Sequence, residues 1–315
     1  MNLDGIHHVT AITADGQRNV DFYAGTLGLR LVKTTVNFDA PDMYHLYLGD
    51  EAGTPGSIMT FFEIPGAGAG RPGPGMVHRV VWRVPSPGSL DYWEARLGDA
   101  GVAARREGGA LRFADPEGLG IELVPDGPGE GEPRRARAED VDPEQALAGI
   151  AGVRAYSRHP EETARLLGQL GFARDGEGAV VTAGPERRGR YVLDDAPAER
   201  GVPGAGTVHH VAWTSLDADH EGWRRRVIET GGAPTGVIDR QYFRSIYFRE
   251  PGHVLFEIAT VSPGFAVDEE PEHLGEGLRL PPQYEDLRER IEERLRPLRN
   301  PRSRTWVPAG AGSGR

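Results

Sequence analysis

The chain has 315 residues, of which 38% are hydrophobic, enough for the core of a globular protein and too many for a disordered one. Its formal net charge of -11 argues against a surface that binds nucleic-acid phosphates. The absence of cysteine excludes disulfides, thiolate nucleophiles and Cys-ligated zinc or iron–sulfur clusters. A bound metal would therefore be held by His, Asp, Glu or Tyr.

Targeting and membrane segments are not evident in the sequence. The first residues, MNLDGIHHV, contain no basic region followed by an apolar run. No stretch approaches the roughly 18 apolar residues that a membrane span needs. We therefore expect a cytoplasmic protein with no signal peptide and no membrane contact.

One supersecondary unit recurs four times along the chain. The first copy reads as a strand over residues 6–13, a helix from the capping residue Asp15 to about residue 27, and strands over residues 30–38, 44–49 and 57–64. The second copy has a strand around residues 77–81 and a helix from about residue 89. The third starts near residue 150, opens its helix at Pro160 and closes over residues 190–193. The fourth has strands over residues 207–214, 242–249 and 254–260, with a helix from about residue 217.

This repetition predicts an α+β fold of four βαβββ modules, paired into two half-barrel-like domains. Residues 1–124 hold the first two modules and residues 149–262 the last two. The charged stretch over residues 125–148, rich in Gly and Pro, is expected to be a linker. Residues 263–315 form a C-terminal extension with a loose end from Asn300. Its predicted helix over residues 283–296 docks through Leu287, Ile291 and Leu295, and is a candidate interface for a homo-oligomer.

Adjacent histidine pairs distinguish the first strands of modules one and four. These strands read IHHVT and VHHVA, whereas those of modules two and three read VHRVV and VRAYS. Because side chains alternate across a strand, one histidine of each pair faces a given side. The second position of the pair is His8 in module one and His210 in module four, but Arg79 and Ala155 in the modules between. Two such strands indicate one shared metal site on a duplicated scaffold.

The closing strands supply candidate carboxylate ligands. Three modules end in Glu63, Glu122 and Glu257, and module three has Asp194 as a loose counterpart. Two neutral imidazoles and one carboxylate make the facial triad that suits Fe(II) and leaves positions open for substrate and O₂. Mn(II) fits the same ligands, whereas Zn(II) would bind but could not support O₂ chemistry. The net positive charge of such a site favours an anionic substrate such as a phenolate.

These motifs resemble those of the vicinal-oxygen-chelate superfamily, which contains glyoxalases, bleomycin-resistance proteins and extradiol dioxygenases. The histidine pairs and the stretch DRQYFRSIYFREPGHVLFEIAT are similar to ring-cleaving dioxygenases of the hydroquinone and chlorohydroquinone type. The resemblance covers about residues 5–262. It implies that the iron ligands are His8, His210 and Glu257. It also implies a set of residues that line the catalytic pocket, namely His7, Thr10, His209, Arg240 and Tyr247.

The expected function is an Fe(II)-dependent extradiol-type dioxygenase that inserts both atoms of O₂ into a small hydroquinone-like or catechol-like aromatic. Tyr247 or a pocket histidine would move the phenol proton, and Arg240 would orient Tyr247 or a substrate oxygen. Two alternatives stay open. One is a metal-dependent isomerase or lyase of the glyoxalase kind, with Glu63 as a fourth ligand. The other is a small-molecule binding protein without turnover. We interpret Glu122 and His78 as structural, and His45, which has no motif around it, likewise.

Overall fold

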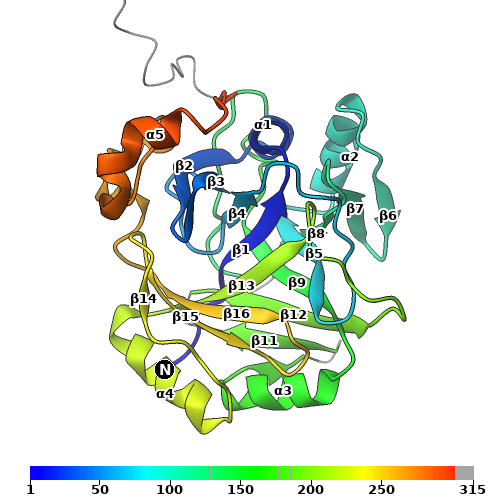
Figure 1. The fold of residues 1–315 in the computed structure, drawn as a ribbon. Helices are drawn as coiled ribbons and strands as arrows, with labels where there is room; N and C mark the ends of the chain where they lie inside the picture. Colours follow the sequence, from blue (N-terminus) through cyan, green and yellow to red (C-terminus); the bar gives the residue numbers. More distant parts are fainter. Residues whose placement is uncertain (128–129, 176–177, 185, 302–315) are drawn as a thin grey trace, which may run out of the picture.

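The strands gather into two large sheets in the computed structural model, which describes residues 1–127, 130–175, 178–184 and 186–301 (Figure 1). In the order of their pairing, the eight described strands of the first sheet are β14 (Ile238–Asp239), β15 (Arg244–Arg249), β16 (Leu255–Thr260), β13 (Val208–Ser215), β1 (Ile6–Thr13), β4 (Ile58–Glu63), β3 (Ala40–Gly49) and β2 (Arg30–Asn37). Those of the second sheet are β10 (Ala173–Arg174), β11 (Ala179–Ala183), β12 (Arg188–Asp195), β9 (Ile150–Ser157), β5 (Met76–Val84), β8 (Gly120–Pro125), β7 (Ala110–Ala114) and β6 (Arg105–Glu107). The predicted α+β fold of curled sheets is confirmed.

Each sheet joins two modules through their first strands. At the centre of the first sheet β1 pairs antiparallel with β13, so this sheet combines modules one and four. In the second sheet β5 pairs antiparallel with β9 and combines modules two and three. Within a module the first strand runs parallel to the last one, as β1 does with β4 and β13 with β16. Each sheet therefore contains one module from each half of the chain. The division into domains at residues 1–124 and 149–262 stays a prediction.

One helix follows the first strand of each module. These helices are α1 (Gly16–Val20), which continues as a π-helix over Asp21–Thr26, α2 (Ser89–Asp99), α3 (Pro160–Gln169) and α4 (His220–Glu229). The predicted start signals are present, since the Asp15 carboxylate accepts the Arg18 backbone N–H at 3.0 Å and Pro160 opens α3. Trp93 of α2 and Trp223 of α4 are fully buried in the core. Among the described residues, no helix combines the length and apolar character that a bilayer crossing requires.

The C-terminal extension differs from the predicted single helix. Residues Pro282–Leu287 form a 3₁₀ helix, and only Arg288–Glu292 (α5) is α-helical. Ile291 and Leu295 are buried as predicted, but Leu287 is 41% exposed. With three residues per turn, the 3₁₀ segment turns Leu287 away from the face that the α-helical period predicts. Asn300, where a loose end is expected, is buried; residues 302–315 lie outside the described residues.

Candidate metal centre and its cavity

Strand register places the two predicted histidine ligands beside Glu257. In the first sheet β13 lies between β1 and β16, so that Ala212 is opposite His8 on one side and Glu257 on the other. His210 precedes Ala212 by two residues and therefore points to the same face of the sheet. Two motifs from opposite ends of the chain thus meet because modules one and four share a sheet.

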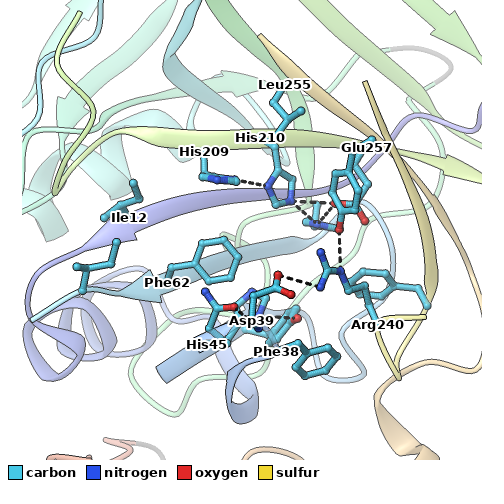
Figure 2. A pocket seen from close by; sticks show the side chains of 16 residues that line it. Ile12, Phe38, Asp39, His45, Phe62, His209, His210, Arg240, Leu255 and Glu257 are labelled. Carbon is cyan, nitrogen blue, oxygen red and sulfur yellow. Dashed lines mark hydrogen bonds and ion pairs between the residues drawn. The ribbon is translucent and has the colours of Figure 1, made fainter. Parts of the chain in front are cut away.

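Three ligand atoms converge on this face (Figure 2). His8 Nε2 lies 3.2 Å from His210 Nε2, and Glu257 Oε2 lies 3.4 Å from the former and 2.9 Å from the latter. These separations match the edges, about 3 Å, of an octahedron with metal–ligand bonds of about 2.1 Å. All three residues are buried, and Glu257 Oε2 has no hydrogen bond of suitable geometry to any described residue. The donor set fits a divalent metal held by two histidines and one carboxylate.

The protonation states of the cluster suit metal binding. Against the effect of burial, the imidazoles of His8 and His210 hold the pKa of Glu257 well below its usual range. Burial lowers the pKa of His210, so its imidazole is neutral. Glu257 Oε1 accepts a hydrogen bond from Ser245 Oγ at 2.5 Å, which leaves Oε2 for the cluster. An ionised carboxylate and neutral imidazoles are the forms that coordinate metals.

The first histidine of each pair lies at a β-bulge, which simple alternation does not predict. The β1–β13 register shifts between Ile6 and His8, and again where the partners change from His210 to Val208. Bulges re-aim side chains beside functional sites. Here they let His7 Nδ1 approach His8 Nδ1 to 2.9 Å, and His209 Nδ1 approach His210 Nδ1 to 2.8 Å.

A backbone carbonyl determines the tautomers of the first histidine pair, His7 and His8. His7 Nε2 lies 3.1 Å from the Thr260 carbonyl oxygen, which can only accept, so His7 carries its proton on Nε2. His7 Nδ1 then accepts the proton of His8 Nδ1. This leaves the Nε2 lone pair of His8 for a metal, as supporting hydrogen bonds do for metal-binding histidines.

The second pair has the opposite environment, because His209 is exposed and lines the cavity. A metal on His210 Nε2 requires the proton on Nδ1, where it is donated to His209 Nδ1. The remaining proton of His209, on Nε2, then faces the cavity. Partial desolvation in the cavity wall and the neighbouring His210 lower the pKa of His209 to about 4, so this ring is neutral.

A cavity of about 310 Å³ opens over the ligand cluster. Aromatic and aliphatic side chains line much of it, including Phe62, Phe243, Ile12, Ile64 and Leu255. Its size and lining suit one aromatic ring. Of the predicted pocket residues, His209, Arg240 and Tyr247 line the cavity, whereas His7 and Thr10 are buried beneath it.

Arg240 and Tyr247 both line the cavity and contact each other. Arg240 Nε donates to the Tyr247 hydroxyl at 3.2 Å, and its Nη1 lies 3.3 Å from Asp39 Oδ2 on the β2–β3 turn (Figure 2). Tyr247 is opposite Glu257 in the β15–β16 register. Burial and the charge of Glu257 raise the pKa of Tyr247, so its phenol stays protonated. The two residues thus place a cation and a phenol hydroxyl beside the ligand cluster.

Glu63, the alternative carboxylate, lies elsewhere. In the β1–β4 register His8 is opposite Ile58, whereas Glu63 is opposite Thr13. Five residues of strand correspond to about 16 Å. Glu63 Oε1 instead accepts the Gly16 backbone N–H at 2.9 Å, at the start of α1. The geometry therefore favours Glu257 as the carboxylate ligand.

His45 lines the cavity, so its interpretation as a merely structural residue misses part of its surroundings. Its Nε2 lies 2.8 Å from Thr60 Oγ1, and its Nδ1 lies 2.9 Å from the Tyr47 hydroxyl. The available signal is strand alternation, which puts His45 and Tyr47 on one face of β3. No repeat or family motif marks this strand.

Ion pairs occupy the corresponding face of the second sheet. His78 Nε2 lies 2.8 Å from Asp194 Oδ2, and Arg112 Nε donates to Glu122 Oε2 at 2.7 Å. Arg79, which replaces the first ligand histidine, lies 3.7 Å from the same Glu122 oxygen. The structural interpretation of His78 and Glu122 agrees with these contacts.

Comparisons with known proteins identify the family to which the chain belongs. The sequence profile of the Glyoxalase/Bleomycin resistance protein/Dioxygenase superfamily matches residues 5–123. A Bacillus subtilis protein named "Putative ring-cleaving dioxygenase MhqO" is 46% identical over 303 residues, which cover 93% of this chain and 96% of that protein. The chain belongs to this superfamily. Its predicted resemblance to vicinal-oxygen-chelate proteins is therefore confirmed.

Other superfamily members extend the comparison. The "Chlorohydroquinone/hydroquinone 1,2-dioxygenase" of Sphingobium indicum is 34% identical, over 95% of this chain and 97% of its own. The crystal structure of a "putative dioxygenase" from Bacillus subtilis has a TM-score of 0.87 and 44% identity, covering 95% of this chain and 98% of that one. Glyoxalase I from Zea mays, with a TM-score of 0.57 and 14% identity over 82% of this chain and 93% of its own, shares the fold.

Proposed function

We propose that this protein is an Fe(II)-dependent, extradiol-type ring-cleaving dioxygenase that inserts both atoms of O₂ into hydroquinone-like or catechol-like aromatics. The observation that carries the proposal is the buried cluster of His8, His210 and Glu257 at the base of a cavity sized for one ring. Relatives named as ring-cleaving and hydroquinone dioxygenases, similar over nearly the whole chain, support it.

The metal would be held by the two Nε2 atoms and by Glu257 Oε2. Fe(II), or Mn(II) in its place, would supply a redox-active Lewis acid for the reaction of the substrate with O₂. The two neutral imidazoles and one carboxylate leave the site with a net positive charge. That charge favours binding of the substrate as a phenolate.

The chain's own residues would bind and orient the substrate. Tyr247, kept protonated, donates a hydrogen bond to an oxygen that gains negative charge, and Arg240 fixes the direction of its hydroxyl. His209 presents its Nε2–H to a second substrate oxygen. Aromatic walls hold the ring in one plane and exclude water from the cavity.

Oxygen uptake after anaerobic reconstitution with Fe(II) tests this function, using hydroquinone, methylhydroquinone and catechol. We expect stoichiometric O₂ consumption with a yellow ring-opened product from at least one of them. The His210→Ala variant, which lacks one ligand, should lose both signals. Absence of uptake with all three diphenols, in a protein that binds one metal per chain, would contradict the proposal.

The glyoxalase-like alternative has less support. Among the described residues, the metal-binding group contains no carboxylate beyond Glu257, since Glu63 binds the start of α1. A binding protein without turnover would not need three buried ligand atoms within coordination distance of one another. The dioxygenase is therefore the function that the geometry favours.

A further inference from the structure

A row of hydrogen bonds leaves the metal cluster and crosses the sheet. Thr10 Oγ1 lies 2.9 Å from His210 Nε2 and 3.0 Å from Thr60 Oγ1. Thr60 Oγ1 lies 2.8 Å from His45 Nε2, and His45 Nδ1 lies 2.9 Å from the Tyr47 hydroxyl. The row thus connects a ligand atom of the cluster on β13 to a buried phenol on β3, three strands away.

Strand register explains why these side chains meet. Thr10 of β1 is opposite His210 on β13 and opposite Thr60 on β4, and Thr60 is opposite Tyr47 on β3. His45 precedes Tyr47 by two residues and shares its face. Thr10, Thr60 and Tyr47 are at most 1% exposed, so water does not compete for the bond between the two threonines, whereas His45 and Tyr47 border the cavity.

The end group of the row determines the direction in which its protons point. Burial raises the pKa of Tyr47 and lowers that of His45, so both groups are neutral. A neutral phenol donates more readily than it accepts, so the Tyr47 hydroxyl donates to His45 Nδ1. His45 then carries its proton on Nε2 and donates it to Thr60, which donates to Thr10.

We propose that His45, supported by Tyr47, is a positioning residue that makes the Thr10 hydroxyl a hydrogen-bond donor toward the metal cluster. In this arrangement the Thr10 hydroxyl, 2.9 Å from His210 Nε2, donates to the lone pair of that nitrogen. Once a metal takes that lone pair, the Thr10 proton turns to an oxygen at the cluster, either Glu257 Oε2 or a bound phenolate. His45 is not a general base in this arrangement, since both ring nitrogens are engaged within the row. Only the effect on phenolate binding rests on the proposed function.

The direction in which the hydrogen bonds of the row donate can be measured in the metal-free protein. Nitrogen NMR of protein with isotope-labelled histidine reports the tautomer of each ring, and His45→Gln identifies the His45 signals by their loss. We expect a single tautomer of His45 with the proton on Nε2 at neutral pH. Tyr47→Phe removes the donor to Nδ1 and should give a mixture of tautomers. A proton on Nδ1 of His45 in the unmodified protein would overturn the proposal.

The consequence for phenolate binding has its own test, in which 4-nitrocatechol is the probe and the Co(II)-loaded protein, kept free of O₂ so that it does not turn over, is the receptor. Thr60→Val keeps the shape of the side chain and breaks the row. We expect its dissociation constant for the probe to rise about tenfold, the effect of losing one hydrogen bond to a charged group. Thr60→Ser should bind as the unmodified protein does. His45→Gln, which keeps a donor near the Nε2 position, should bind more tightly than His45→Leu.

Thr182→Val is the matched control, because Thr182 is buried in the second sheet and its hydroxyl has no hydrogen-bond partner among the described residues. It should bind the probe as the unmodified protein does. Unchanged binding in folded Thr60→Val would overturn the proposed effect. If the unmodified Co(II)-loaded protein does not bind the probe, the proposed function fails, and the tautomer of His45 still decides the direction of the row.

Discussion

Glu257 and Glu63 both belong to the closing strands of their modules, but strand register places them differently. Glu257 is opposite Ala212, two residues after the ligand His210, whereas Glu63 is opposite Thr13, five residues after the ligand His8. Glu257 Oε2 lies beside two imidazole nitrogens, and nothing else described bonds to it. Glu63 is bonded to the backbone of Gly16, and burial raises its pKa. A glutamate therefore belongs to the candidate metal cluster in module four, whereas in module one a glutamate binds the N-terminus of α1.

This difference predicts opposite outcomes for two identical substitutions. Glu257→Gln removes the charge that offsets a cation, so we expect the Mn(II) dissociation constant to rise by more than about 100-fold, beyond the cost of losing a supporting group around a metal. Glu63→Gln keeps an oxygen for the Gly16 N–H and should leave Mn(II) affinity unchanged. Calorimetric titration of both variants measures the difference. Equal losses of affinity would show that Glu63 is also a ligand.

At the level of elements, the C-terminal extension is anchored by a buried cation on β2. Lys33 is fully buried and forms ion pairs with Asp268 and Glu269. Asp268 also accepts hydrogen bonds from the Tyr242 hydroxyl at 3.1 Å and from Gln241 Nε2 at 2.7 Å. Gln241 and Tyr242 are the two residues that follow Arg240 in the chain. The extension therefore holds in place the segment that carries Arg240, which lines the cavity.

Lys33→Met should therefore destabilise the protein. It leaves Glu269 buried with Arg279 as its remaining cation, and removing one partner of a buried ion pair costs about 3–5 kcal/mol of unfolding free energy. Urea unfolding measures the loss. Arg105→Met, which breaks an exposed pair with Glu107, is the control and should leave the unfolding free energy unchanged. If Lys33→Met were as stable as the unmodified protein, apolar contacts of the extension would suffice to hold it.

Local patterns predict the modules, because caps and periodicity act within one element. The Asp15 cap and the start of α3 at Pro160 are examples. The bulges at His7 and His209 depend on the partner strand, so no local pattern reveals them. The tail is similar, since its leucine spacing predicts an α-helix but residues Pro282–Leu287 form a 3₁₀ helix.

The candidate site, too, could be predicted from the sequence only in part. His8 and His210 follow from comparing the four repeats, whereas Glu257 needed the family resemblance to separate it from Glu63. His45 carries no motif, and its connection to the cluster exists only because Thr60 of β4 lies between them.

At the scale of the whole molecule, two sheets of similar topology have different roles. The first holds the ligand cluster, and the second holds ion pairs on the equivalent face. There Asp194 is bonded to His78 Nε2 at 2.8 Å and to Arg154 Nε at 2.9 Å. Against the effect of burial, these two partners hold the pKa of Asp194 below its usual range. The second sheet therefore contributes stability that depends on pH.

Asp194→Asn tests this contribution. Because the folded pKa lies below the unfolded value of about 3.9, the ionised carboxylate stabilises the fold above that pH, and this stability is lost as the pH falls through the folded pKa. We expect the variant to lose about 1–2 kcal/mol of unfolding free energy at neutral pH, since the site is partly open to solvent. Urea unfolding at a series of pH values should show the difference shrinking as the pH falls below about 3.9, the unfolded pKa.

Mn(II) affinity separates this role from that of the metal cluster. Asp194 belongs to the second sheet, so Asp194→Asn should bind Mn(II) as the unmodified protein does. A difference in stability that stayed constant at every pH would mean that shape, not charge, makes Asp194 important. A loss of Mn(II) binding would mean that the two sheets are coupled through β1 and β9, which lie beside each other at the junction of the sheets.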